Sequence, residues 1–136
     1  MATLLIIDDD SNVRDTLHDL FCGAHECHTA DRAEQALQYL EFETYDAVLT
    51  DISMPGLGGL ALLRTITERH PTTPVIVISG QVDADRELLV ELGAFDFFTK
   101  PFQLAEIEDS VQRALNYRDE MKAGFSARPD EAPEST

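Results

Sequence analysis

Four short apolar runs of this sequence are each followed by side chains that carry oxygen or nitrogen. These are an acidic pair, a single carboxylate, a hydroxyl and an amine: Asp8, Asp9, Asp51, Ser79 and Lys100. Carboxylates packed together repel one another, and this raises the pKa of at least one of them unless cations neutralise the charge. Lys100 supplies one positive charge, and a hard divalent ion such as Mg²⁺, which prefers oxygen ligands, suits the remaining deficit. A carboxylate held beside an ammonium and a hydroxyl can attack a phosphoryl group whose charge the cations neutralise.

Each of these residues also has a plain structural interpretation. Asp8–Asp10 could be a solvated charge run that the dipole of a following helix favours. Asp51 or Ser79 could cap the segment that comes next, and Lys100 could be an ordinary surface lysine. The joint order of acid pair, acid, hydroxyl and amine at four strand ends favours a site over these separate roles. The Lys100-Pro101 step also permits a cis peptide bond that could aim the ammonium inward.

The elements that must position these side chains alternate along the chain. Apolar runs predict strands at Leu4–Ile7, Asp46–Thr50, Pro74–Ile78 and Ala94–Phe98, and a weaker pattern predicts a second strand at Glu26–Ala30. Amphipathic helices are expected after each strand, with Ser11 or Asn12 capping the first and Asp31 capping the second. Such alternation predicts an α/β fold, a parallel sheet with right-handed crossovers and helices on both faces. In open sheets of this kind, ligands bind beyond the carboxyl ends of the strands, where Asp51 is expected to lie.

Composition limits the classes of function. The 136 residues support one domain, which we place at 1–121, followed by a flexible acidic tail or the start of a linker to an absent output domain at 122–136. The net charge of −16 predicts no direct nucleic acid binding and no binding to anionic membranes. No apolar run has membrane-spanning length, and the start of the chain does not resemble a signal peptide. We therefore expect a cytoplasmic protein.

Two cysteines and two histidines lie close together in sequence: Cys22, His25, Cys27 and His28. Their spacing is superficially that of a metal cluster. Cys27, however, falls on a predicted strand, and no Cys-x-x-Cys motif supports zinc. We favour a structural role with reduced thiols.

The motifs together resemble the receiver domain of bacterial two-component response regulators, over about Thr3 to Tyr117. The resemblance rests on Leu-Leu-Ile-Ile-Asp-Asp-Asp, Asp-Ile-Ser-Met-Pro-Gly from Asp51, Val-Ile-Ser-Gly from Val77, and Gly-Ala-Phe-Asp-Phe-Phe-Thr-Lys-Pro-Phe from Gly93. It implies a flavodoxin-like (βα)5 three-layer sandwich with strand order 2-1-3-4-5.

The same resemblance implies a phosphorylation switch. Asp51 would accept a phosphoryl group from a phosphohistidine on a sensor histidine kinase. Asp9 would bind Mg²⁺ directly and Asp8 mainly through water, with Asp51 and the backbone carbonyl of Ser53 completing the protein ligands. Ser79 would move toward the phosphoryl group, Lys100 would read its charge, and Phe97 would rotate inward behind it. This would remodel the surface of the fourth helix, fifth strand and fifth helix, which family members use for dimerisation or for contact with an output domain or effector.

Two other functions compete with this interpretation. One is a true phosphohydrolase of the haloacid-dehalogenase type, which usually has a second Asp two residues after its nucleophile. Ser53 holds that position here, and this argues against turnover. The other is a scaffold of the same fold that is not phosphorylated, which the presence of Asp51 and Lys100 disfavours. The chain is therefore expected to be no enzyme in the turnover sense, although it would assist its own phosphorylation and dephosphorylation.

Overall fold

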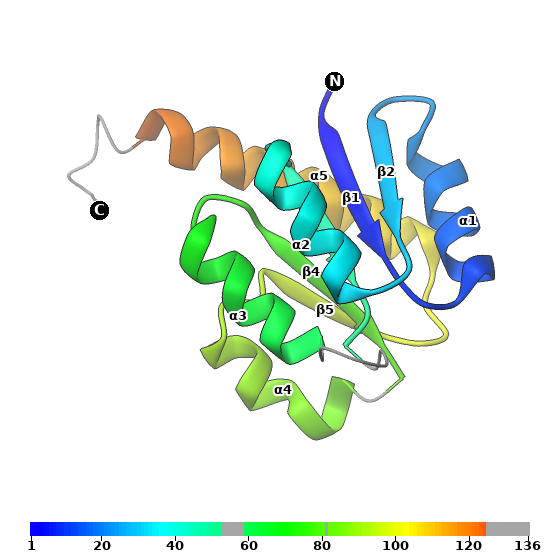
Figure 1. Ribbon diagram of the computed structural model, residues 1–136. Helices are drawn as coiled ribbons and strands as arrows, with labels where there is room; N and C mark the ends of the chain where they lie inside the picture. Colours follow the sequence, from blue (N-terminus) through cyan, green and yellow to red (C-terminus); the bar gives the residue numbers. More distant parts are fainter. Residues whose placement is uncertain (53–58, 81, 125–136) are drawn as a thin grey trace.

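A single parallel sheet forms the centre of the molecule, with its strands in the order β2-β1-β3-β4-β5 (Figure 1). The computed structural model describes residues 1–52, 59–80 and 82–124. The strands are β1 (Thr3–Ile7), β2 (Glu26–Ala30), β3 (Ala47–Thr50), β4 (Val75–Ser79) and β5 (Asp96–Thr99). The helices are α1 (Ser11–Phe21), α2 (Ala33–Phe42), α3 (Gly59–Arg69), α4 (Val82–Glu91) and α5 (Leu104–Gly124). The predicted α/β fold and strand order 2-1-3-4-5 are confirmed.

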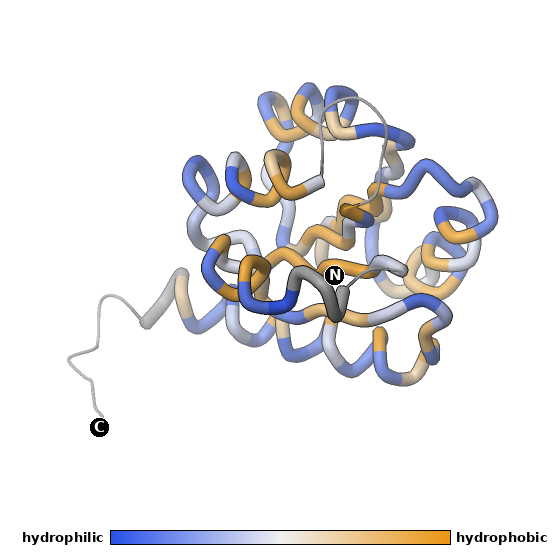
Figure 2. Tube along the Cα trace, turned by 90° about the horizontal axis from the view of Figure 1, so that it is seen from below, coloured by the Kyte–Doolittle hydropathy of each residue, from blue (hydrophilic) through white to orange (hydrophobic). Residues whose placement is uncertain are grey.

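Two hydrophobic cores, one on each face of the sheet, hold the layers together. Alternate strand residues point to opposite faces, so in β1 Leu5 and Ile7 join one core while Leu4 and Ile6 join the other. The first core packs against α2, α3 and α4, and the second against α1 and α5. Figure 2 shows the result as hydrophobic strand segments enclosed by helices whose outer sides are hydrophilic.

The predicted start of the first helix was wrong by one residue. Its N-cap is Asp10, because this residue has an extended backbone and its carboxylate accepts a hydrogen bond from the Asn12 backbone nitrogen. The Asp10 backbone nitrogen itself donates to Asp8 Oδ1 at 2.9 Å. The cap of the helix is therefore coupled to one of the acidic strand-end residues.

The predicted cap of the second helix was also wrong. Arg32 is the N-cap of α2, without a side-chain capping bond. Asp31 instead pairs with the Arg32 guanidinium at 3.1 Å, and its backbone nitrogen donates to Gln35 Oε1.

Helix α5 is fastened to the far end of the sheet by Arg118, which is buried on a helix that otherwise carries many exposed polar residues. Its Nε donates to Asp46 Oδ1 at 3.0 Å, and its Nη1 donates to the backbone oxygen of Thr72 and to Thr73 Oγ1, both at 3.0 Å. The helix continues to Gly124, and residues 125–136 lie outside the described part of the chain. The domain boundary after residue 121 stays a prediction. Within the part that is described, none of the helices is both long and apolar enough to span a membrane.

Candidate functional site

The carboxyl ends of the strands bring the acidic residues to one edge of the sheet. Strands β1 and β3 are paired in register up to Ile7 and Thr50, and the Asp51 backbone nitrogen extends this pairing by donating to the Ile7 oxygen at 2.9 Å. Asp8 follows β1 directly and Asp51 follows β3 directly, so the two residues occupy equivalent positions at the ends of neighbouring strands. Strand β5 contributes from the far side, where the Lys100 backbone nitrogen donates to the Ser79 oxygen at 2.9 Å.

Lys100 bridges the two buried carboxylates. Its Nζ lies 2.8 Å from Asp8 Oδ2 and 3.1 Å from Asp51 Oδ2. Asp8 is 2% exposed and Asp51 4% exposed, whereas Asp9 is exposed to solvent. One carboxylate oxygen from each of the three acids lies within 4.8 Å of the others. The Lys100-Pro101 peptide bond, which the sequence permits to be cis, is cis.

The protonation of this cluster follows from burial and pairing. Burial is the largest influence on Asp8 and raises its pKa, against the opposing hydrogen bonds from Lys100 and from the Asp10 backbone. Burial lowers the pKa of Lys100, but its hydrogen bonds to Asp8 and Asp51 outweigh this effect and leave the pKa above its ordinary value. Lys100 is therefore an ammonium at neutral pH.

The donor set fits a hard divalent cation. Within the described part of the chain, Lys100 is the cation that pairs with these three carboxylates, and two of the three are withdrawn from water. The cluster therefore retains negative charge that a cation would neutralise. All its potential ligand atoms are oxygens, which Mg²⁺ prefers. The fourth predicted ligand, the backbone carbonyl of Ser53, lies outside the described residues.

Gly59 at the start of α3 allows the chain to pass close behind Asp51. A Cβ atom at this position would overlap Ile52 Cα and lie 2.7 Å from the Asp51 backbone oxygen. A side chain at residue 59 would therefore have to displace the backbone that carries Asp51.

Ser79 and Phe97 lie on neighbouring strands of the sheet. Ser79 ends β4, which pairs with β3, and it is fully buried. Phe97 lies in the middle of β5, half-buried against the core beneath α2, α3 and α4. The Arg86 guanidinium of α4 stands over its ring, 4.7 Å from the centroid. Sequence reasoning missed Arg86, because a cation–π contact between a helix and a strand leaves no spacing signal.

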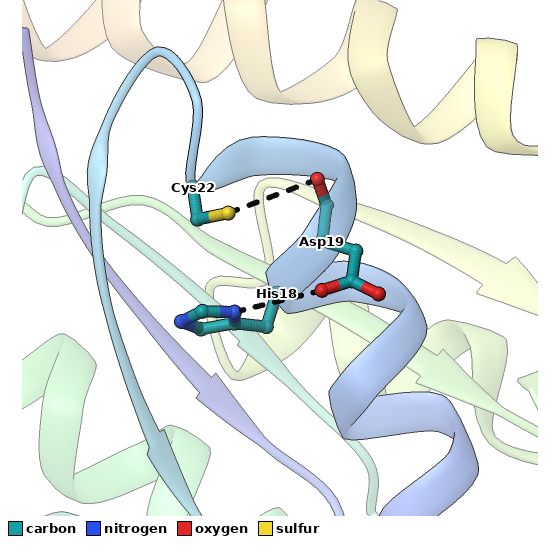
Figure 3. Close-up of side chains that lie close together, drawn as sticks. All are labelled: His18, Asp19 and Cys22. Carbon is teal, nitrogen blue, oxygen red and sulfur yellow. Dashed lines mark hydrogen bonds and ion pairs between the residues drawn. The ribbon is translucent and has the colours of Figure 1, made fainter.

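The cysteines and histidines separate into different surroundings. Burial raises the pKa of the half-buried Cys27 thiol to about 11, which suits a structural cysteine. Cys22 instead lies beside His18 and Asp19 at the end of α1, where its thiol contacts the Asp19 backbone oxygen (Figure 3). His28 contacts Glu26 and Tyr45.

Comparison with known proteins agrees with this geometry. The family model described as the response regulator receiver domain matches residues 4–112. The DNA-binding transcriptional regulator NtrC of Escherichia coli K12 is 39% identical over 119 residues, which cover 86% of this chain and 25% of the relative. The response regulator protein FleR of Pseudomonas aeruginosa is 37% identical over 114 residues, or 82% of this chain and 24% of the relative. The chain thus spans about a quarter of the length of these curated relatives.

Solved structures show the same architecture. A response regulator receiver domain protein from Clostridium thermocellum has a TM-score of 0.82 and 30% identity, covering 89% of this chain and 99% of that one. NtrX from Brucella abortus has a TM-score of 0.85 and 32% identity, covering 93% of this chain and 29% of that one. With the sheet order, the acidic strand ends and the match to most of the folded residues, the chain belongs to the response regulator receiver domain family of two-component systems.

Proposed function

We propose that Asp51 accepts a phosphoryl group from a phosphohistidine of a sensor histidine kinase, in a reaction that requires Mg²⁺, and that this switches the surface formed by α4, β5 and α5. The single observation that carries the proposal is the bridge from Lys100 to the buried carboxylates of Asp8 and Asp51. The phosphoryl-accepting role is general for the family, whereas the assignment of roles to particular residues of this chain is part of the proposal.

The chemistry is a displacement at phosphorus. An Asp51 carboxylate oxygen forms the new P–O bond while the P–N bond to the donor imidazole breaks, and the imidazole leaves with the bonding electron pair. Mg²⁺, when held by Asp8, Asp9, Asp51 and the Ser53 carbonyl, supplies positive charge for the phosphoryl oxygens. The Lys100 ammonium already faces Asp51 and would compensate negative charge on the phosphoryl oxygens as well.

The added charge would first change the positions of side chains on the neighbouring strands β4 and β5. Ser79 would donate a hydrogen bond to the phosphoryl group, and Phe97 would turn inward behind it. Four apolar side chains on α4 and α5 are at least one-third exposed, and an output domain, an effector or a second copy of the phosphorylated chain could cover them: Leu88, Val90, Leu104 and Tyr117. The chain's charge of −16 disfavours nucleic acid and membranes as direct partners. We place this switch in the cytoplasm, where its kinase would phosphorylate it.

Peptide mapping after incubation with phosphoramidate and Mg²⁺ tests the acceptor. We expect one base-labile acyl phosphate on Asp51, which is lost with a chelator and in Asp51→Asn. The exposed Asp15→Asn variant serves as a matched control and should be phosphorylated normally. Modification at Ser79 or Thr50 in place of Asp51 would refute the assignment.

A steady-state assay with generic phosphate esters separates the switch from the rival phosphohydrolase. We expect no more than the slow loss of one phosphoryl group per molecule. Many turnovers per molecule would identify an enzyme of the haloacid-dehalogenase type and overturn the switch.

A further inference from the structure

His28 is held in a fixed orientation between two oxygen atoms at the edge of the sheet. Its Nδ1 lies 2.7 Å from the hydroxyl of Tyr45, and its Nε2 lies 2.7 Å from Glu26 Oε2. Tyr45 is 1% exposed, and its ring meets the imidazole edge-on with centroids 5.4 Å apart. A second edge-on contact comes from Tyr39 at 6.4 Å. A buried hydroxyl and two aromatic rings therefore fix the direction in which Nε2 points.

Glu26 lies where Nε2 points, and a second carboxylate lies close to both side chains. Glu26 and His28 are two residues apart on β2, so their side chains share one face of the strand. Glu43, which follows α2, brings a third ligand atom, and the ligand atoms of Glu26, His28 and Glu43 all lie within 4.8 Å of one another. The group is separate from the Asp51 pocket, because Glu26 pairs with Thr3 at the start of β1 and Asp8 follows the end of the same strand.

We propose that Glu26, His28 and Glu43 form a second metal site, which takes a first-row transition dication of the zinc type. An imidazole with two carboxylates is a ligand set used for such ions, and three protein ligands leave a fourth position for water. Glu26 and Glu43 are exposed, so an ion can enter from solvent. Their two negative charges balance the charge of the dication.

The contact with Tyr45 is of the kind that orients metal-bound histidines. A histidine that binds metal through one ring nitrogen usually donates a hydrogen bond from the other, which fixes its tautomer. In the metal-free chain the Glu26 carboxylate can only accept a hydrogen bond, so this contact requires a hydrogen on Nε2. When the ion takes that place, a neutral imidazole carries its hydrogen on Nδ1, where the Tyr45 oxygen accepts it.

The group at the end of α1 competes for the same metals. His18, Asp19 and Cys22 also have ligand atoms within 4.8 Å of one another (Figure 3). His18 and Asp19 lie near the end of α1 and Cys22 is its C-cap, and His18 Nδ1 lies 4.0 Å from Asp19 Oδ1. The test therefore uses a Cys22→Ser background, which removes the thiolate that zinc would prefer there.

Calorimetric titration of the full chain with Zn²⁺, in saturating Mg²⁺ to occupy the Asp51 pocket, tests the proposal. We expect His28→Gln to abolish a binding event that Glu43→Gln weakens at least about tenfold. Tyr45→Phe should weaken it by about 10–100-fold, which is typical of outer partners of metal ligands. Glu41→Gln, an exposed glutamate of α2 that is not a ligand, is the matched control and should bind zinc as the parent does.

Long-range ¹H–¹⁵N spectra of the histidine rings give an independent readout. Zinc should move the His28 Nε2 resonance and fix the tautomer with hydrogen on Nδ1, and the Glu43→Gln chain should still fold because that side chain is exposed. The proposal is overturned if zinc does not bind, if Glu43→Gln binds as tightly as Glu41→Gln, or if His28 is unaffected. Phosphorylation at Asp51 should be the same in Glu43→Gln as in the parent, so failure of one site does not imply failure of the other.

Discussion

Replacing Lys100 with alanine removes an ammonium that bridges Asp8 and Asp51. Both carboxylates are less than 5% exposed, and the Lys100 side chain is itself 24% exposed. Removing one partner of a buried ion pair lowers the free energy of unfolding by about 3–5 kcal/mol. Because Lys100 is partly exposed, we expect the lower end of this range, about 3 kcal/mol. We therefore expect Lys100→Ala to lower the free energy of unfolding of the metal-free chain by this amount at neutral pH.

Urea unfolding at neutral pH in the presence of a chelator measures this loss. The control is Arg113→Ala, which removes an exposed cation that also pairs with two carboxylates, those of Asp96 and Asp109. Exposed pairs contribute little, so the control should lose less than about 1 kcal/mol. If Lys100→Ala is as stable as the parent, Lys100 does not hold the carboxylates together and the reasoning is refuted. Added Mg²⁺ should restore stability to Lys100→Ala, which should still be phosphorylated but switch weakly.

Three further predictions follow from other contacts. Burial raises the folded-state pKa of Asp8 above its ordinary 3.8, so the free energy of unfolding of the metal-free chain should fall as pH rises from 3.8 through the folded-state pKa. Urea unfolding at several pH values should show this slope in the parent chain and not in Asp8→Asn. A parent chain without the slope would contradict the burial effect. Gly59→Ala should lower the free energy of unfolding in urea by about 1–3 kcal/mol and slow phosphorylation, because the added Cβ meets the backbone of Asp51 and Ile52. The control Gly23→Ala, where the added Cβ has open space around it, should change neither quantity. Arg86→Gln removes a cation–π contact worth about 0.5–1 kcal/mol. The ratio of inward to outward Phe97 rings should therefore change about two- to fivefold in ¹⁹F NMR spectra of the chain labelled with fluorophenylalanine. An unchanged ratio would show that Arg86 does not hold the ring.

Local pattern was enough to predict the sheet. Most strands were short apolar runs ended by polar residues, so their positions followed to within one or two residues, and alternation with helices predicted a parallel sheet. The strand at Glu26–Ala30 had only a weak pattern of its own. The strand order came from the family resemblance. The meeting of Asp8, Asp51 and Lys100 followed from where strands end, because a parallel sheet brings those ends to one edge.

Contacts between distant side chains were beyond local pattern. Arg118 meets Asp46 and Thr73 across the end of the sheet, and the Tyr45 hydroxyl reaches His28 from another strand end. Neither pairing has a periodic signal, since each depends on how a helix or loop packs in three dimensions. The Asp10 cap was missed for a related reason. In a run of three consecutive acids, sequence alone does not distinguish a metal ligand at the strand end from a helix cap. The extended backbone at Asp10 makes it the cap.

Reaction with monophosphoimidazole, followed by ³¹P NMR, measures the central claim most directly, because this donor carries the P–N bond of phosphohistidine and needs no cognate kinase. With Mg²⁺, the donor signal should fall as one equivalent of acyl phosphate appears on the parent chain. The acyl phosphate should be absent with a chelator and in Asp51→Asn. An equal acyl phosphate signal from Asp51→Asn, or from the parent chain without Mg²⁺, would contradict the account.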